Sequence, residues 1–430
     1  MYPDFHYLLR SLLGTEVPEW LSLFKTFGLF VALAFLAGSY MLMQDIKSKE
    51  AKGLLLPTFS TIVVGKPASA NELGWSAFWG FLLGFKVGGF FGYWQEIAPN
   101  PMGYVFSAQG NFIAGIIGAL LMGYLKYAEK RKAQLPEPQE RRVATYPHQR
   151  ITEFVVIAMI AGLAGAKVFN AFETWDDFIR NPVESLLSSS GLTFYGGLIT
   201  AAMAIAFYAR KHQISIAHLA DCFAPALMLA YGIGRLGCHF AGDGDWGIFN
   251  SAYVTQLDGS LLHAAPGEFV KAIHSDQNFL SRMVAEFGGA DHIPHLYRSA
   301  PSWLPDWMFG MNYAHNVNNE GVPIANCFGQ YCSVLPVSVF PTALYEAFTC
   351  TLLFLLLWKL RSKMKYALQI SGVYLILNGL ERFLVEKIRV NYKYDWGFLH
   401  PTQAEIISSL LIVFGIVLYF IAASRKKNPI

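Results

Sequence analysis

Charged residues are scarce in this chain of 430 residues. Asp, Glu, Lys and Arg together make up 15% of it, whereas a soluble domain carries about 25%. Hydrophobic residues reach 54% and gather in long apolar runs. The shortage of charge therefore argues against an ordinary soluble domain and predicts a protein that lies in the lipid bilayer.

A strong net charge and paired cysteine motifs are also lacking. The net charge is only +3, so nothing indicates a nucleic-acid partner. The 5 Cys include no CxxC pair and no zinc-ligand spacing. Cys327 and Cys332 would form a disulfide or remain two free thiols, and the sequence leaves both options open. The first apolar run, near Trp20, lacks a small-residue cleavage site, so we expect a retained helix rather than a signal peptide.

Nine apolar segments are long enough to cross a bilayer, which takes about 20 helical residues. They are residues 22–44, 75–95, 106–127, 151–171, 191–209, 216–236, 337–359, 366–388 and 401–423. Glycines and Lys86 interrupt the second and third segments. We predict an all-α polytopic membrane protein with about nine transmembrane helices.

Lysine and arginine are unevenly distributed between successive loops. They are concentrated in residues 45–74, 126–150, 210–215, 360–365 and 424–430. The positive-inside rule assigns these stretches to the cytoplasm, so the N-terminus lies outside and the C-terminus inside. Residues 1–236 then hold helices one to six, residues 237–336 form an extracytoplasmic cap, and residues 337–430 hold helices seven to nine.

Two of the predicted hairpins are alike. Residues 84–87 (Gly-Phe-Lys-Val) parallel residues 165–168 (Gly-Ala-Lys-Val), and Trp94 or Trp175 follows each. A tandem duplication of one hairpin would explain the similarity. Chance explains it equally well, because small residues commonly mediate the packing of membrane helices.

Most of the ionisable and polar side chains that stand out in the last six spans lie at outward ends. They are Lys167, Tyr195, Arg235, Tyr345, Glu346, Arg382, Glu386 and Arg389. Charged groups within a bilayer are costly and usually functional. Their shared depth predicts one site in the extracytoplasmic half of the bundle.

Arg382, Glu386 and Arg389 form a stripe on one helical face, because their spacing is i, i+4, i+7. Such a stripe must face the bundle interior or a water-filled cavity. Two guanidinium groups suit a phosphate, which they bind through paired hydrogen bonds. Glu386 would hold an arginine in place or take up a proton. The alternative is an Arg–Glu contact that only joins helices, but Arg235 and Lys167 at the same depth favour a site.

A glycine-rich run, residues 232–247, follows the sixth span. It contains Arg235, His239, Asp243 and Asp245, which supply an anion binder, a titratable base and two carboxylates at the membrane surface. One alternative is a polar loop that only turns the chain. The other is a calcium loop, but no bidentate Glu follows at EF-hand spacing.

The same residues resemble a known family. Gly234-Arg235-Leu236-Gly237, followed by Trp246-Gly247, is similar to the signature of the prolipoprotein diacylglyceryl transferases. Other similar segments, in the family's order, are Tyr195-Gly196-Gly197, residues 340–346, and the Arg-Phe-x-x-Glu-x-x-Arg pattern of residues 382–389. The resemblance covers helix one and helices four to nine. An extra helical hairpin and the long cap would be additions to the family's usual seven spans.

The chain departs from the family pattern at several polar positions. Cys238-His239 stands where the family has Asn, and Asp243 or Asp245 stands where it has Glu. Tyr195 and Phe340 occupy two positions at which the family has His. These departures leave open a divergent paralogue that uses another phospholipid or another acceptor.

The resemblance implies a reaction at the extracytoplasmic side of the bacterial inner membrane. The lipobox cysteine of a lipoprotein precursor would attack a phospholipid, phosphatidylglycerol in the family, and glycerol phosphate would leave. No metal or organic cofactor is implied. The expected catalytic residues are Arg235, Arg382, Glu386 and His239, the last being our own inference. The expected substrate-binding residues are Arg389, Tyr195, Gly196, Gly197, Tyr345, Glu346, Lys167, Asp243 and Asp245.

A transporter or channel for an anionic solute is a hypothesis of another class, because intramembrane cations would suit it too. A transporter should carry polar groups near the membrane midplane. The cytoplasmic halves of these helices look apolar, which favours the enzyme.

Overall fold

The structure is a computed structural model. It describes residues 1–90, 92–93, 97, 104–105, 107–187, 191–256, 259–327, 329–391, 393–395, 397 and 399–424. Trp94 and the tail cations Arg425, Lys426 and Lys427 lie outside the described residues. The chain forms two compact units, Met1–Ile46 with Ala217–Ile430, and Lys47–Ile216.

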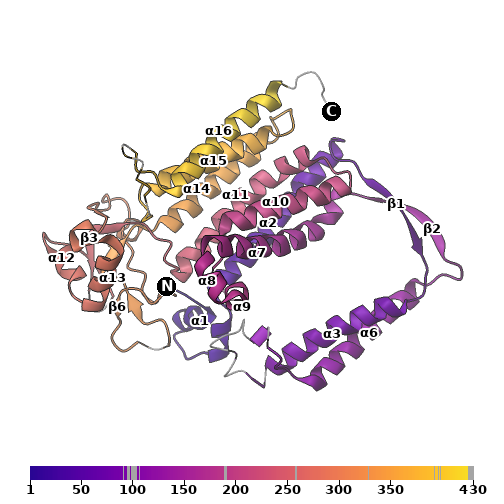
Figure 1. Cartoon of the computed structure of the whole chain (residues 1–430), viewed down its shortest axis with the longest axis horizontal. Helices are drawn as coiled ribbons and strands as arrows, with labels where there is room; N and C mark the ends of the chain where they lie inside the picture. Colours follow the sequence, from indigo (N-terminus) through magenta and orange to yellow (C-terminus); the bar gives the residue numbers. More distant parts are fainter. Residues whose placement is uncertain are drawn as a thin grey trace. The chain divides into compact units, whose positions relative to one another are not determined.

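Most of the described chain is helical, and the prediction of a polytopic membrane protein is confirmed in this coarse form (Figure 1). Six helical segments of the described residues are long and apolar enough to cross a membrane. They are α2 (Thr26–Ala51), α6 (Phe112–Ala133), η2 with α7 (Pro147–Glu173), α11 (Ile216–Ala241), α14 (Thr342–Leu360) and α16 (Gln403–Ser424). Three further predicted spans are helices as well, namely α3 (Ala70–Phe90), α10 (Phe194–Lys211) and α15 (Gln369–Glu386).

The helices of the first unit pack closely through small residues. A Cβ built on Gly232 of α11 would lie 3.1 Å from the Cys350 Cβ of α14, and one on Gly372 of α15 would lie 2.9 Å from the Gly415 carbonyl oxygen of α16. The α11–α14 contact is filled by a core that includes Met228 and Phe354. Close approach at small residues is the usual way in which helices associate in membranes.

Asp221 fixes α15 relative to α11. Its carboxylate accepts hydrogen bonds from the backbone N–H groups of Leu368 (2.8 Å) and Ser371 (2.9 Å) at the start of α15. Carboxylates at a helix N-terminus satisfy N–H groups that the helix itself leaves unpaired. The sequence indicated only an end-of-helix residue without a catalytic role, and the contact is structural.

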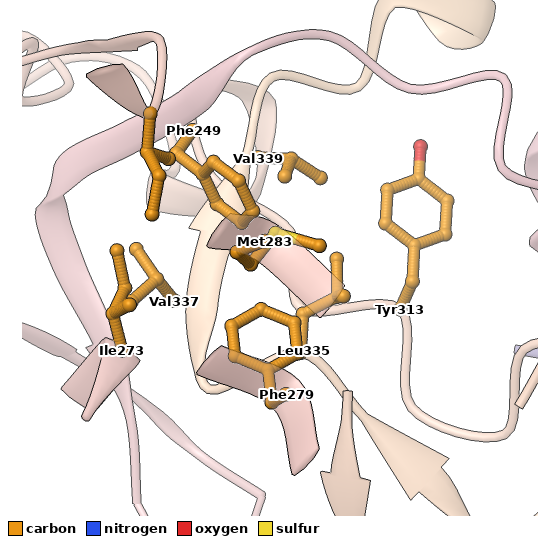
Figure 2. Packing of buried hydrophobic residues seen from close by; sticks show 9 residues of the cluster. Phe249, Ile273, Phe279, Met283, Tyr313, Leu335, Val337 and Val339 are labelled. Atoms are coloured by element: carbon orange, nitrogen blue, oxygen red, sulfur yellow. The ribbon is translucent and has the colours of Figure 1, made fainter. Parts of the chain in front are cut away.

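The segment between α11 and α14 folds around its own core. Strand β3 (Phe249–Thr255) pairs with β4 (Leu261–His263), β5 (His295–Leu296) and β8 (Val337–Val339). Helices α12 (Glu268–Ile273) and α13 (Gln277–Phe287) belong to the same segment. Apolar side chains from strands, helices and loops meet in it (Figure 2), namely Phe249, Ile273, Phe279, Met283, Ile293, Tyr313, Leu335, Val337 and Val339.

This segment, residues 242–341, is called the insert below. The sequence predicted a cap here but no strands, so the small sheet is a finding of the structure. The shortest elements are η3 (Ala290–His292), η4 (Asp306–Met308), β6 (Val322–Pro323) and β7 (Ser333–Val334). Cys327 and Cys332 form a disulfide, which decides the question that the sequence left open. Ahead of α2, the chain forms α1 (Phe5–Leu13) and η1 (Glu19–Leu23).

The second unit contains two helical hairpins, α3–α6 and α7 (Ile151–Glu173) with α10, and an antiparallel ribbon of β1 (Thr58–Val64) and β2 (Gln139–Thr145). The short helices α8 (Trp175–Arg180) and α9 (Pro182–Leu187) connect α7 to α10.

The two lysines of the predicted repeat have similar contacts. Lys86 donates to the carbonyl oxygens of Tyr104 (2.8 Å) and Ser107 (2.6 Å), and Lys167 donates to that of Ser185 (3.2 Å). Each therefore binds backbone of the connection that follows its helix. The duplication itself stays a prediction.

Replacement of Gly118 by alanine should weaken the α3–α6 hairpin. A Cβ there would lie 3.2 Å from the Gly84 Cα and would also meet the Gly80 carbonyl, whereas a Cβ on Gly123 would meet only the Ala77 Cβ, at 3.8 Å. We expect Gly118→Ala to lower the free energy of unfolding in detergent by about 1–3 kcal/mol. The control, Gly123→Ala, should cost nothing. Equal stabilities would contradict the close approach.

Candidate active site

The site lies where three segments of the first unit meet. These are the end of α11 with the start of the insert, the start of α14, and the end of α15 with the residues that follow it. Gly247 N donates to the Phe340 carbonyl (2.8 Å), and Ile248 N donates to the Ile388 carbonyl (2.9 Å). Gly247 also forms a β-bridge with Arg389. Backbone hydrogen bonds therefore hold the three segments in register.

Glycines bring the chain back from the end of α11 toward the site. Gly242 and Gly244 have φ of 65° and 91°, a left-handed conformation that glycine adopts without steric cost. The reversal returns Asp245 to Arg235, and the two side chains form an ion pair. At Gly247 a Cβ would lie 2.6 Å from the Ile388 carbonyl oxygen, so only glycine fits this crossing. The glycine-rich run is thus part of the site's construction.

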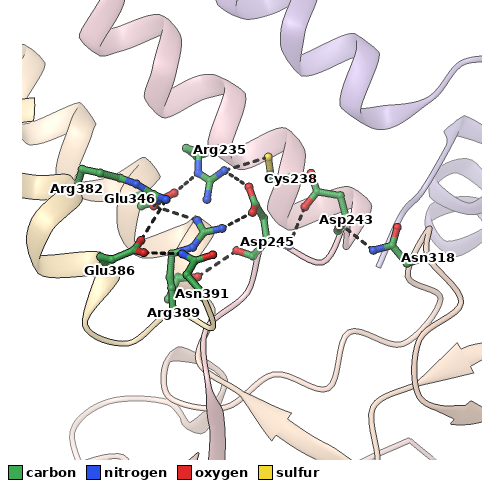
Figure 3. A network of polar contacts seen from close by, with 11 residues as sticks. Arg235, Cys238, Asp243, Asp245, Asn318, Glu346, Arg382, Glu386, Arg389 and Asn391 are labelled. Carbon is green, nitrogen blue, oxygen red and sulfur yellow. Dashed lines mark hydrogen bonds and ion pairs between the residues drawn. The ribbon is translucent and has the colours of Figure 1, made fainter. Parts of the chain in front are cut away.

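Glu346 is the centre of the ion-pair network (Figure 3). Its side chain is completely buried, and it pairs with Arg235, with Arg382 at 3.1 Å and with Arg389 at 3.4 Å. The three arginines come from positions far apart in sequence, yet they converge on one carboxylate. The predicted convergence of Arg235 with Arg382 and Arg389 is therefore present in the structure.

Two more carboxylates complete the network. Asp245 pairs with both Arg235 and Arg389. Glu386 pairs with Arg382 at 3.2 Å and accepts a hydrogen bond from the Asn391 amide at 2.7 Å. The i, i+4 pair on α15 is the contact that the stripe predicted. Three guanidinium groups therefore face three carboxylates.

The arginines keep hydrogen-bonding capacity beyond these pairs. The buried Nη2 of Arg235 has no hydrogen-bond partner among the described residues. A guanidinium carries more N–H donors than one or two carboxylate contacts use, and its planar fork suits phosphate oxygens. The network can therefore accept the oxygen of an anionic group without first losing its carboxylates.

Asp243 and Asp245 lie beside each other in different electrostatic surroundings. Burial raises the pKa of Asp243. Burial also acts to raise the pKa of Asp245, but the charges of Arg235 and Arg389 outweigh it and lower that pKa to about 2. The ligand atoms of Cys238 and the two aspartates lie within 4.8 Å of one another. A metal ion there would have to compete with two arginines for Asp245.

His239 and Tyr345 contact the insert. His239 is buried, and its Nδ1 lies 3.1 Å from the hydroxyl of Tyr313. The Tyr345 hydroxyl donates to the Met308 carbonyl. The structure brings Arg235, Arg382, Glu386, Arg389, Glu346 and Asp245 into one network, and it gives His239 and Tyr345 neighbours in the insert instead.

The remaining predicted site residues, Lys167, Tyr195, Gly196 and Gly197, belong to the second unit. Gly197 lies where α10 approaches α7, because a Cβ there would meet the Gly162 carbonyl oxygen at 2.9 Å. Gly196 would likewise meet the Phe169 side chain. These contacts account for the two glycines as packing residues, and a substrate-binding role for the four stays a prediction.

Glu381 escaped the sequence analysis. It is 4% exposed, and neither carboxylate oxygen has a hydrogen-bond partner among the described residues. A charged residue inside an apolar helix was the available signal. Glu381 was passed over because it lies next to Arg382 but off the stripe that continues through Glu386.

Fold and site together define an integral membrane protein whose buried arginine cluster is built to bind an anionic group. Comparison with known proteins makes the class specific. Residues 112–421 match the family model for prolipoprotein diacylglyceryl transferase. The match begins in α6, the second helix of the predicted extra hairpin.

Several relatives are named phosphatidylglycerol–prolipoprotein diacylglyceryl transferase. The protein of Xylella fastidiosa (strain 9a5c) is 28% identical over 287 residues, which is 65% of this chain and 78% of that one. The protein of Xanthomonas euvesicatoria pv. vesicatoria is 27% identical over 276 residues, 62% of this chain and 72% of that one. The protein of Leptospira interrogans serovar Lai is 30% identical over 165 residues, 33% of this chain and 48% of that one.

The chain belongs to the prolipoprotein diacylglyceryl transferase family. The prediction of a diacylglyceryl transferase is thereby confirmed, and the alternative of an anion transporter or channel has no support.

Two buried glutamates should respond differently to replacement by glutamine. Glu346→Gln leaves three arginines without their shared counter-ion, and breaking a buried ion pair costs about 3–5 kcal/mol. Glu381→Gln breaks no described ion pair and keeps the shape. We expect thermal unfolding in detergent to show a large loss for Glu346→Gln and a small change for Glu381→Gln. Equal losses would refute the role of Glu346 as the shared counter-ion.

Asp245 should make the protein sensitive to acid. Its pKa lies below the ordinary value of 3.8 in the folded state. Its stabilisation is therefore complete above about pH 4 and is lost as the pH falls toward 2. Over this range we expect wild type to lose more thermal stability than Asp245→Asn. Asp291→Asn, at an exposed position of η3, should behave as wild type. Parallel losses in wild type and Asp245→Asn would argue against these ion pairs.

Proposed function

We propose that this protein transfers the diacylglyceryl group of phosphatidylglycerol to the lipobox cysteine thiol of lipoprotein precursors. Membership of the transferase family supports the reaction. The convergence of Arg235, Arg382 and Arg389 on Glu346 is the observation that carries the proposal for the site. Such a cluster can grip the one phosphate that the reaction must release.

The proposed topology has nine transmembrane helices, with the N-terminus outside and the C-terminus in the cytoplasm. The cation-rich loops support it through the positive-inside rule. The site, at the opposite end of α11 from these loops, then faces the extracytoplasmic side of the bacterial inner membrane. The insert, within the cap predicted for residues 237–336, lies outside as well. The helices before and after the cap, in residues 1–236 and 337–430, form the membrane part.

The proposed reaction is a displacement at carbon. The thiolate sulfur attacks the glycerol carbon that bears the phosphate ester, a C–S bond forms, and the C–O bond to phosphate breaks. Glycerol phosphate leaves with the electron pair of the broken bond, so negative charge grows on its phosphate. Fixed guanidinium groups stabilise charge that develops in a transition state. We assign this role to Arg235, Arg382 and Arg389.

The proton of the thiol needs an acceptor, since the thiolate is the nucleophile. We propose His239, with Glu386 as the alternative. His239 is buried beside Tyr313, and Glu386 is already paired with Arg382. From the acceptor the proton passes to solvent or to the departing phosphate, which balances the reaction.

The acidic residues would act through the arginines. Glu346 and Asp245 fix the guanidinium groups and are proposed as positioning residues rather than as direct headgroup ligands. Tyr195, Tyr345, Asp243, Lys167, Gly196 and Gly197 remain proposed contributors to substrate binding.

A second candidate is a paralogue that uses another phospholipid or another acceptor. The Cys238-His239 pair and the residues Tyr195 and Phe340, at positions where the family pattern differs, favour it. Expression in a bacterium depleted of its own transferase distinguishes the two. Rescue supports the first proposal, and failure despite membrane insertion supports the second.

Arg235→Ala and Arg382→Ala should each lower transfer about 100- to 1,000-fold, the usual effect of removing a donor to transition-state charge. The assay uses purified protein, vesicles with labelled phosphatidylglycerol and a lipobox peptide. Arg361→Ala is the matched control, because Arg361 forms an ion pair with Asp45 at 2.7 Å outside the network. It should lose stability but keep activity. Full activity of either site variant would overturn the assigned role.

A further inference from the structure

A cavity of about 490 Å³ lies beside the arginine network in the first unit. One wall consists of the segments that follow α11 and α15, including Asp245 and Arg389. The other wall is formed by α13 and by nearby insert residues such as Glu320. Its volume is in the range of pockets that bind ligands, about 300–1,000 Å³.

The cavity is continuous with the network. Asp245 and Arg389 line it, and these two side chains are themselves an ion pair. A molecule bound in the cavity would therefore lie next to an arginine that we assign to the phosphate. An acceptor chain must reach that phosphate to deliver its thiol.

The cavity walls do not suit acyl chains. Arg282, Glu286 and Glu320 line it, and charged groups are costly to bury against hydrocarbon. Apolar surface is present as well, from Phe279, Phe287 and Leu335. This mixture of separated charges and apolar side chains is typical of sites that bind a polypeptide.

The acidic side is without a cation among the described residues. Arg282 donates to the Gly321 carbonyl at 3.3 Å, and Glu320 accepts from the Asn318 amide at 2.9 Å. Neither Glu286 nor Glu320 forms an ion pair with a described residue. Burial raises the pKa of Glu286, and the negative charge of Glu320 raises it further. A positive charge from a ligand would relieve this repulsion.

We propose that the cavity binds the first residues after the reactive cysteine of the acceptor polypeptide, with a basic side chain seated at Glu286 and Glu320. The inference rests on the proposed function for the acceptor's identity. A signal segment occupies the membrane and the mature chain follows it, so the residues after the cysteine continue into the extracytoplasmic space. The insert then contributes to the choice of acceptor.

Binding can be tested without the transfer reaction. Two fluorescent peptides carry a signal segment and a lipobox in which serine replaces the cysteine, followed by Lys-Lys or Asp-Asp. Their affinities for the protein in phosphatidylglycerol nanodiscs are measured by anisotropy. Wild type should bind the Lys-Lys peptide more tightly. Glu286→Lys should shift the ratio of the two Kd values about tenfold toward Asp-Asp, from a changed pair worth about 1 kcal/mol.

Two further variants make the result specific. Ala285→Lys places the same charge at an exposed neighbouring position of α13 that does not line the cavity, and it should leave the ratio unchanged. Glu320→Lys should repeat the effect of Glu286→Lys from another segment, which guards against misfolding of one variant.

The outcomes separate this inference from the proposed function. A charge preference that reverses in both cavity variants supports it, even if cysteine peptides are not modified, in which case the proposed reaction alone fails. Unchanged Kd ratios in both variants, with transfer intact, overturn it. A changed KM for phosphatidylglycerol with an unchanged peptide preference also overturns it, because the cavity would then hold the lipid headgroup.

Discussion

The Glu346 carboxylate has no exposure to solvent and is the shared counter-ion of Arg235, Arg382 and Arg389. Three guanidinium groups could not stay together in a membrane protein without it, because unpaired buried charges are costly and like charges repel. Its place in the first turns of α14 thus determines where α11 and the end of α15 must meet. The rest of the site is arranged around this requirement.

The backbone meets the requirement in two ways. The glycines after α11 reverse the chain, and the crossing at Gly247 joins residues before α14 to residues after α15. At the other end of the bundle, Asp221 binds the start of α15. The arginine side chains are therefore held on helices and on a short bridged segment. Such preorganisation is what stabilisation of a developing phosphate charge needs.

Periodicity and membrane cost were enough to predict much of this arrangement. The spacing of Arg382, Glu386 and Arg389 gave one face, and shared depth added Arg235. Glu346 was expected at the site, but its role as a common counter-ion depends on side-chain geometry that no spacing reveals. The strands of the insert are short and were not recognised. Glu381 was missed because it lies off the stripe. These contacts join distant residues, so local patterns do not encode them.

The central claim is that the arginine cluster holds the phosphate of the lipid substrate. A cryo-electron microscopy structure of the protein in nanodiscs of phosphatidylglycerol tests it most directly. The account predicts density for a lipid phosphate within hydrogen-bond distance of at least two of Arg235, Arg382 and Arg389. A well-ordered phosphatidylglycerol headgroup bound away from all three arginines, with the cluster contacting only its own carboxylates, would contradict it.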